Sequence, residues 1–431
     1  MSGGVKISLN AIGPQDQYIK TSNTNNSFFR DTYKKHSNFA NSLVVIEPSL
    51  ILNNSSSSYK FGETLSFNIE KISDLLVLLN IEFQLESELN GGNPLWEDGT
   101  RIVPETLFGL IEYIELVVGD ITIQRMTGDW LYVWSHFNNK HEMGNLLDTM
   151  YASKFSRSNK RSQTDKDYYT LFMPLPFYFY DSRSSALPLW AIQHQSVKIN
   201  LKLRDFRTIS ASTEVESNYV IRNIRLLGEF AELDQDEKHK FQNMSLEYCI
   251  DQVEFCGENL INAKNMNKSM IKKIKIPQYN LVNELVWVFR STPATFVPNT
   301  FFNYWLDHDG SNRKDHSNNT SILLNGRPIN PKFPGDYYRT VNRYEHHNSD
   351  IVRKWDFSDD SDKKGNCIYC HSFSLNPSNV NSNGFLSLEK FNDVELDLKI
   401  LATSHERTIL VFVKHSNLIR IKNGYLDMLS K

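Results

Sequence analysis

Strict alternation of apolar and polar residues recurs along this chain and restricts it to folds built from half-buried β-strands. The clearest instance is Val197–Arg204, in which every odd-numbered residue is apolar and every even-numbered residue is polar. Val394–Ile400 repeats the pattern near the carboxyl end. Because successive side chains of a strand point to opposite faces, a period of two indicates one face in a core and one in water.

Turn signals separate several of these segments. Gly119-Asp120 lies between two apolar segments, Ile114–Val118 and Ile121–Gln124. The pattern predicts a hairpin, because glycine readily adopts the positive φ of a tight turn. Asn325-Gly326 is a second signal of this kind. Two further segments are apolar on both faces and predict central strands: Leu285–Phe289 and Ile409–Val413.

Helical signals are sparse. The best is Asp129–Phe137, where Asp129 is expected to cap the first turn and Leu131, Trp134 and Phe137 form an apolar stripe. Ser27–Lys35 predicts a second helix of a turn or two. Mostly β-structure without regular alternation of strand and helix indicates an all-β fold of sandwiches or barrels, with a few short helices in loops.

The length of 431 residues exceeds what one hydrophobic core usually supports. A polar, charge-dense stretch at residues 232–240 separates two blocks of similar size. We therefore predict an amino-terminal arm at residues 1–40, a first domain at 41–231, a linker at 232–244 and a second domain at 245–431. Polar segments predicted as surface loops are residues 53–58, 154–167, 307–320 and 359–366.

Charge and targeting signals limit the partners. Lys and Arg number 47 against 50 Asp and Glu, so the net charge of −3 gives no drive to coat a nucleic acid, and direct nucleic-acid binding is not expected. The first residues lack a secretory signal pattern, and no apolar run reaches the roughly 18 residues of a membrane span. A protein made in the cytosol, with free thiols, is the expectation.

The amino-terminal segment carries a long motif. Gly13–Ile19 reads G-P-Q-D-Q-Y-I, and Ser27–Ala40 contains F-F-R-D-T-Y-K-K-H-S-N-F-A. Both resemble the start of major capsid proteins of nucleocytoplasmic large DNA viruses, and Gly128–Trp134 resembles that family's G-D-W-L-x-[IV]-W. In the second half, Leu281–Arg290 is similar to its P-V-K-E-L-I-W-V-x-[QR] pattern.

This resemblance implies two consecutive eight-stranded jelly-roll sandwiches, a double jelly roll. It also implies a structural capsid protein without cofactor or catalytic residues, which self-assembles as a homotrimer into pseudo-hexagonal capsomers of an icosahedral shell. The expected partners are neighbouring capsomers, minor capsid proteins and membrane-associated proteins inside the shell, with assembly in the host cytoplasm. The aromatic residues of the arm need apolar partners and are therefore candidate assembly residues: Phe28, Phe29, Tyr33 and Phe39.

Two motifs could carry chemistry. Cys367–His371 reads C-x-x-C-H, the pattern of haem attachment, but Cys367 and Cys370 point to opposite faces of an extended strand, so buried thiols are the preferred interpretation. Glu345-His346-His347 could ligand a metal or move a proton. No second acid or nucleophile is fixed nearby in the sequence, and we predict a structural role and no metal.

Three other functions stay open at this point. One is a minor capsid paralogue of the same fold, and another is a β-sandwich module that binds host glycans through long loops. A hydrolase on a sandwich scaffold is the third, although the sequence cannot bring two carboxylates together.

Overall fold

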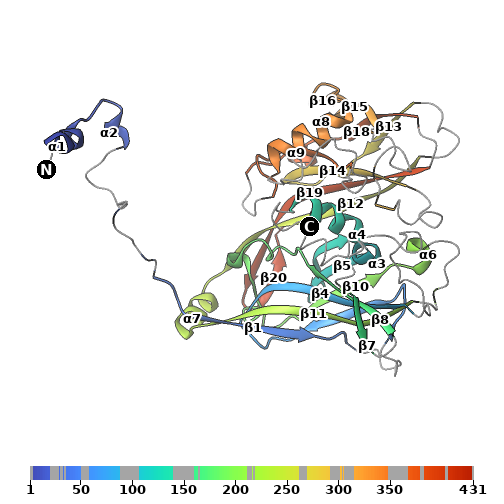
Figure 1. Cartoon of the computed structure of the whole chain (residues 1–431), viewed down its shortest axis with the longest axis horizontal. Helices are drawn as coiled ribbons and strands as arrows, with labels where there is room; N and C mark the ends of the chain where they lie inside the picture. The colour runs from blue at the N-terminus through green and yellow to red at the C-terminus, as the bar shows by residue number, and fades with distance from the viewer. Residues whose placement is uncertain are drawn as a thin grey trace. The chain divides into compact units, whose positions relative to one another are not determined.

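Two compact units make up the chain, Met1–Asn38 and Phe39–Lys431. The computed structural model describes residues 3–19, 29, 33, 35–49, 58–87, 106–138, 160–163, 166–210, 216, 219–261, 269–291, 301, 302, 304, 315–347, 367–378, 383–402 and 406–429. The first unit contains two short helices, α1 (Gly3–Asn10) and α2 (Asp16–Ile19). The second unit contains every strand of the described chain, arranged as two β-sandwiches (Figure 1).

The first sandwich is built from two antiparallel sheets. One contains, in spatial order, β1 (Phe39–Ile46), β11 (Tyr219–Leu233), β4 (Leu75–Ser87), β8 (Lys166–Pro174) and β7 (Lys160–Gln163), with β2 (Ser58–Tyr59) beside β11 and β9 (Leu187–Pro188) beside β4. The other contains β3 (Thr64–Ile69), β10 (Val197–Leu203), β5 (Ile111–Val118) and β6 (Ile121–Thr127).

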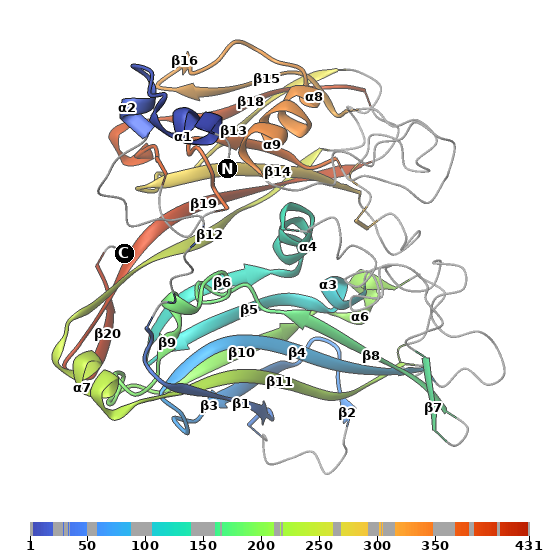
Figure 2. The same ribbon diagram turned by 60° about the vertical axis from the view of Figure 1, so that its left-hand side comes forward.

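The second sandwich repeats this plan. Its first sheet contains β12 (Leu246–Ile261), β19 (Arg407–Lys422), β14 (Val282–Ser291) and β17 (Tyr369–Ser372), with β20 (Tyr425–Met428) beside β19. Its second sheet contains β13 (Met270–Lys275), β18 (Val394–Ile400), β15 (Ser317–Leu324) and β16 (Arg327–Pro328). Figure 2 shows the two pairs of sheets one above the other.

The two sandwiches share one topology. When β2, β7, β9 and β20 are set aside, eight main strands remain in each sandwich, and numbered along the chain they are ordered 1-8-3-6 in one sheet and 2-7-4-5 in the other, in both sandwiches. This is the strand order of a jelly roll, so the expected double jelly roll is confirmed. The predicted domain boundaries stay a prediction; β11 ends at Leu233 and β12 begins at Leu246.

Short helices occupy the connections. Helix α4 follows the fifth main strand of the first sandwich, and α8 and α9 follow the fifth main strand of the second, so both sandwiches carry helices in the same connection. Among the described residues after the first unit, the helices are α3 (Thr106–Leu110), α4 (Gly128–Phe137), η3 (Arg183–Ser185), α6 (Phe206–Ile209), α7 (Gln235–Asn243), α8 (Gly335–Arg339), α9 (Val341–His346) and η8 (Leu388–Lys390). Within the described ranges no helix has the length and apolar character to cross a membrane.

The predicted strands and turns agree with the structure. Strand β10 alternates strictly between buried and half-buried residues, as its sequence requires. Gly119, with φ of +61°, turns the chain between β5 and β6. Asn325 and Gly326 both have positive φ and join β15 to β16. The doubly apolar segments lie in β14 and β19, which are neighbours inside their sheet and are buried on both faces.

Three local predictions were wrong. Residues 160–163 were predicted as loop but form β7, whose backbone pairs with β8. Thr127, and not Asp129, caps α4, because its hydroxyl accepts a hydrogen bond from the Trp130 amide at 3.2 Å while Asp129 points into the protein. Residues 317–320 were predicted as loop but form the start of β15, where buried polar side chains bond one another: the Ser317 and Thr320 hydroxyls lie 2.8 Å apart. The predicted helix over Ser27–Lys35 lies outside the described residues except at Phe29, Tyr33 and Lys35.

Candidate functional site

The four predicted assembly residues fall in both units. Phe28 lies outside the described residues. Phe29 and Tyr33, in the first unit, are exposed, with relative accessibilities of 101% and 86%. Phe39 is the first residue of the edge strand β1, where it pairs with Leu233 and remains half exposed. Their role in assembly stays a prediction.

A buried charge network joins the two sandwiches. Asp129 of α4, in the first sandwich, accepts hydrogen bonds from Arg290 of β14, in the second sandwich, at 3.1 Å to each carboxylate oxygen. Arg204, which follows β10, donates to the same carboxylate at 3.0 Å. Arg290 also reaches Glu258 of β12 at 2.7 Å, and the ring of Phe301 lies 5.1 Å from both guanidinium carbons.

The charge state of this network follows from its surroundings. Burial alone raises the pKa of Asp129, but the positive charges of Arg290 and Arg204 outweigh burial and hold that pKa below its usual value. Asp129 is therefore a carboxylate at neutral pH. Because a buried carboxylate is tolerated only when it is paired and hydrogen-bonded, the network fixes the position of α4 against the second sandwich.

Two glutamine side chains cross the seam between the sandwiches in opposite directions. Gln124 of β6 donates to the backbone carbonyl of Asp251 in β12, and its amide oxygen accepts from the Tyr178 amide at 2.7 Å. Gln252, the neighbour of Asp251, donates to the carbonyl of Ile123, the neighbour of Gln124, at 2.5 Å. Each glutamine is buried, and the reciprocal pair donates to backbone carbonyls of β6 and β12, which are the edge strands of their sheets.

The carboxyl-terminal hairpin is held by the first sandwich. The Gln195 side chain donates to the carbonyl of Leu426 in β20 at 3.2 Å and accepts from the Leu426 amide at 2.7 Å, as a neighbouring strand would. The His194 amide donates to the carbonyl of Gly424 at 3.2 Å. The final strand, β20, therefore closes one end of the seam.

Aromatic rings close the other end of the seam. The ring centroids of Trp130 in α4 and Phe412 in β19 are 5.5 Å apart. Phe137, the last residue of α4, stacks on the His347 ring at 4.3 Å. Arg343 of α9 donates to the carbonyl of His136, and burial with the nearby charge of Arg343 lowers the pKa of His136 to about 3, so the imidazole is neutral.

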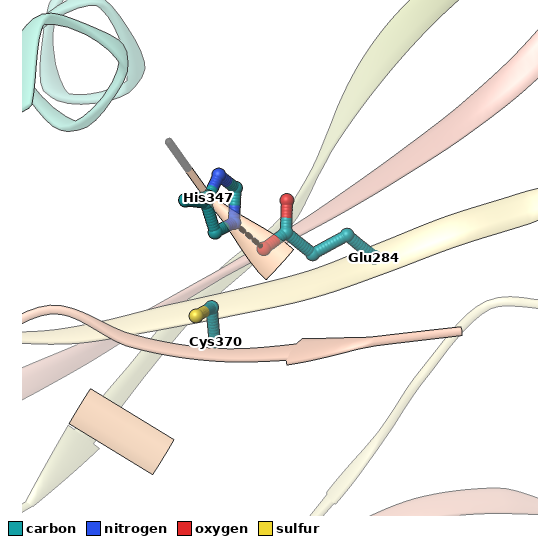
Figure 3. Close-up of side chains that lie close together, drawn as sticks. All are labelled: Glu284, His347 and Cys370. Atoms are coloured by element: carbon teal, nitrogen blue, oxygen red, sulfur yellow. Dashed lines mark hydrogen bonds and ion pairs between the residues drawn. The ribbon is translucent and has the colours of Figure 1, made fainter. Parts of the chain in front are cut away.

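Beside this contact three buried side chains converge (Figure 3). Glu284 of β14, His347 at the end of α9 and Cys370 of β17 place one ligand atom each within 4.8 Å of the others. The His347 Nε2 and Glu284 Oε1 atoms are 2.6 Å apart. Burial, with the negative charge of Glu284, raises the pKa of Cys370 well above its usual value, so its thiol is protonated.

The sequence motifs contribute to this cluster only in part. His347 comes from the Glu-His-His triplet and Cys370 from C-x-x-C-H, whereas Cys367 precedes β17 and lies 2.9 Å from the Tyr369 hydroxyl, outside the cluster. All four cysteines are free thiols; Cys367 and Cys370 are buried, and Cys249 and Cys256 are partly buried. Glu284 was missed although it interrupts the apolar stripe of Val282, Val286 and Val288, because this signal marks a buried polar group without identifying its partners.

Comparison with known protein families identifies relatives that match both sandwiches. The family described as major capsid protein N-terminus matches residues 27–228, and the family described as large eukaryotic DNA virus major capsid protein matches residues 237–426. The chain belongs to the major capsid protein family of large eukaryotic DNA viruses. The two matches cover the two sandwiches in turn, so the family assignment extends over both.

Individual relatives agree with the family. The major capsid protein of Pyramimonas orientalis virus is 26% identical over 98% of both chains. Capsid protein 1 of Acanthamoeba polyphaga mimivirus is 29% identical over 67% of this chain and 49% of its own length. Among solved structures, the PBCV-1 capsid model superposes with a TM-score of 0.74 over 94% of this chain and 100% of the other, at 18% identity. The Faustovirus major capsid protein gives 0.68 over 93% of each chain, at 10% identity.

The family assignment indicates a structural role for the polar groups buried between the two sandwiches. Relatives in this family are structural capsid proteins and not enzymes, so the buried polar groups at the seam of this capsid protein serve its architecture. One sequence signal could have revealed the glutamine pair. Gln252 interrupts the apolar stripe of β12 formed by Leu246, Tyr248 and Ile250, and a polar residue on such a stripe needs a buried partner.

Proposed function

We propose that three copies of this capsid protein assemble into a trimeric capsomer with a pseudo-hexagonal outline, and that these capsomers tile an icosahedral shell. The observation that carries the proposal is that one chain contains two sandwiches of identical strand order, joined by a buried seam. Three such chains around a threefold axis place six similar blocks in a ring. A ring of this kind uses head-to-tail interfaces and closes without free edges.

The arm supplies contacts outside the block in this proposal. Phe29 and Tyr33 are large apolar residues exposed in the first unit, and Phe39 leads from the arm into the edge strand β1. Leu43 and Val45 are also exposed on the same face of β1 as Phe39. Exposed apolar residues gain free energy when a partner covers them. We assign them, together with Phe28, to contacts with neighbouring capsomers and minor capsid proteins.

The remaining partners follow from charge and setting. A net charge of −3 supports a shell that does not bind the genome directly. Membrane-associated proteins inside the shell are proposed as partners of its inner surface, and the host cytoplasm as the place of assembly. No exposed catalytic constellation is needed, because assembly proceeds through surface burial without a covalent step.

Light scattering after size-exclusion chromatography tests the trimer. The expected species has the mass of three chains of 50.0 kDa each, and a strictly monomeric protein at high concentration would contradict the proposal.

The arm is tested with the double variant Phe29→Ser, Tyr33→Ser. We expect the trimer to persist while association of trimers into larger sheets or shells is lost. Tyr18→Ser is the matched control, because Tyr18 is also an exposed aromatic residue of the first unit, at 93% accessibility, but lies outside the proposed contact residues. Equal loss of association in the control would show that the named residues have no special role.

A further inference from the structure

The buried cluster of Glu284, His347 and Cys370 is more than a polar contact in a shell subunit. We propose that it is a zinc site, held by the Glu284 carboxylate, the His347 Nε2 atom and the Cys370 thiolate. The inference is independent of the trimer proposal, since all three residues belong to one sandwich of one chain.

The fold brings the three side chains together from separate elements. In the ladder between β14 and β17, Cys370 pairs with Val286 and Ser372 pairs with Glu284. Cys370 is therefore the diagonal neighbour of Glu284 and lies on the same face of the sheet. Helix α9 ends over this face, and His347, its C-cap residue, completes the cluster. All three side chains are almost fully buried.

The donor set matches zinc among the common metal ions. Thiolate, imidazole and carboxylate are the three protein ligand types of zinc, and calcium and magnesium take oxygen ligands almost alone. The His347 Nδ1 atom lies 3.2 Å from the Ser378 hydroxyl, which can accept its proton and leave Nε2 free to bind a metal. Three protein ligands leave the fourth tetrahedral position for a water molecule.

Binding requires a small shift and a balanced exchange of protons. Two ligands of a tetrahedral zinc ion at ordinary bond lengths lie about 3.3 Å apart, so the 2.6 Å contact between His347 and Glu284 must lengthen. A small rotation of either side chain supplies this. The Cys370 thiol loses its proton to solvent, and the neutral imidazole keeps one proton, now on Nδ1.

The charge of the loaded site suits its surroundings. One zinc ion with a thiolate and a carboxylate is neutral overall. It therefore adds no net repulsion to Arg343, whose buried guanidinium bonds the carbonyl of His136 across the seam. The ion would tie β14, β17 and the end of α9 together directly beneath the Phe137 ring. Zinc binding is thus expected to stabilise the seam as well as the second sandwich.

Metal analysis of the full-length protein, purified with zinc and dialysed, tests the proposal. We expect one zinc ion per chain in the native protein and almost none in Cys370→Ser. Cys367→Ser is the matched control, because it removes another fully buried thiol two residues before β17 yet leaves the cluster intact, and it should retain the ion. Removal of zinc by a chelator should lower the thermal midpoint of the native protein and of Cys367→Ser.

A second measurement covers the case in which Cys370→Ser does not fold. The native protein loaded with cobalt in place of zinc should show the ligand-to-metal charge-transfer band of a thiolate ligand. Clearly less than one zinc ion per chain in the folded native protein, or a cobalt spectrum without that band, would overturn the proposal. The cluster would then be a hydrogen-bonded Glu-His pair beside a neutral thiol.

Discussion

Replacing Asp129 by asparagine should be among the most damaging single changes that preserve side-chain volume. The substitution removes the carboxylate that Arg204 and Arg290 share. Among the described residues, the acidic side chain that remains paired with Arg290 is Glu258, which is half exposed. Removing one partner of a buried charge pair typically costs about 3–5 kcal/mol. The ring of Phe301 and the Glu258 carboxylate offset part of this loss, so we expect about 3 kcal/mol.

Guanidinium unfolding followed by tryptophan fluorescence measures the effect, at one fixed protein concentration because association contributes to stability. Glu247→Gln is the matched control: it makes the same chemical change in the pair with Arg420, but both side chains are nearly half exposed, so it should cost at most about 1 kcal/mol. Equal losses in the two variants would refute the reasoning from buried charge.

Two further measurements sharpen this prediction. Arg290→Gln combined with Asp129→Asn should cost less than the sum of the single changes, because each single change already breaks the shared contact. Since the folded-state pKa of Asp129 is depressed, its contribution is complete above the unfolded-state value of about 4 and is lost as the pH falls below it. The native protein and Asp129→Asn should therefore converge in stability towards low pH.

Three more predictions concern the seam and its helix. His136 has a pKa of about 3 in the folded protein, where it is neutral, whereas an unfolded histidine titrates near 6.5. The free energy of unfolding should therefore fall by about 2 kcal/mol between pH 8 and pH 5. His136→Gln should remove this part of the pH dependence in unfolding curves. Gln124→Ala and Gln252→Ala should each cost about 1–3 kcal/mol, and fully additive losses in the double variant would argue against the reciprocal arrangement. A Cβ atom at Gly128 would lie 2.2 Å and 2.3 Å from two backbone carbonyl oxygens, so Gly128→Ala should lower the denaturation midpoint strongly, while Gly4→Ala, with nothing within 4 Å, should leave it unchanged.

The strands of this fold could be predicted because their signal is local. Alternation in Val197–Leu203 reports burial directly, and the glycine at 119 is required by its own backbone angle. The cap of α4 was misassigned because a local rule treats Thr127 and Asp129 as equivalent candidates. Only the arginines that draw Asp129 inward distinguish them, and Arg290 is 161 residues away in the sequence.

The candidate sites were hidden for the same reason. Glu284, His347 and Cys370 come from three separate segments, and Glu284 and His347 are 63 positions apart in the sequence. No rule of residue spacing connects them. Their meeting depends on the register of β17 against β14 and on the place where α9 ends. Ser317 and Thr320 suggested a loop because both are polar. In the structure their buried hydroxyls bond each other, and composition alone does not reveal this contact.

The hydrogen bonds between the Gln195 side chain and the Leu426 backbone have a consequence for biosynthesis. The two residues are 231 positions apart, and at roughly 5–20 residues per second a ribosome needs tens of seconds to pass from one to the other. For most of that interval, once β11 has ended at Leu233, the amino-terminal jelly roll is translated, yet the surface around Trp130 has no complete second jelly roll to cover it. Protection of nascent chains by chaperones during this stage should determine how much soluble subunit an infected cell obtains.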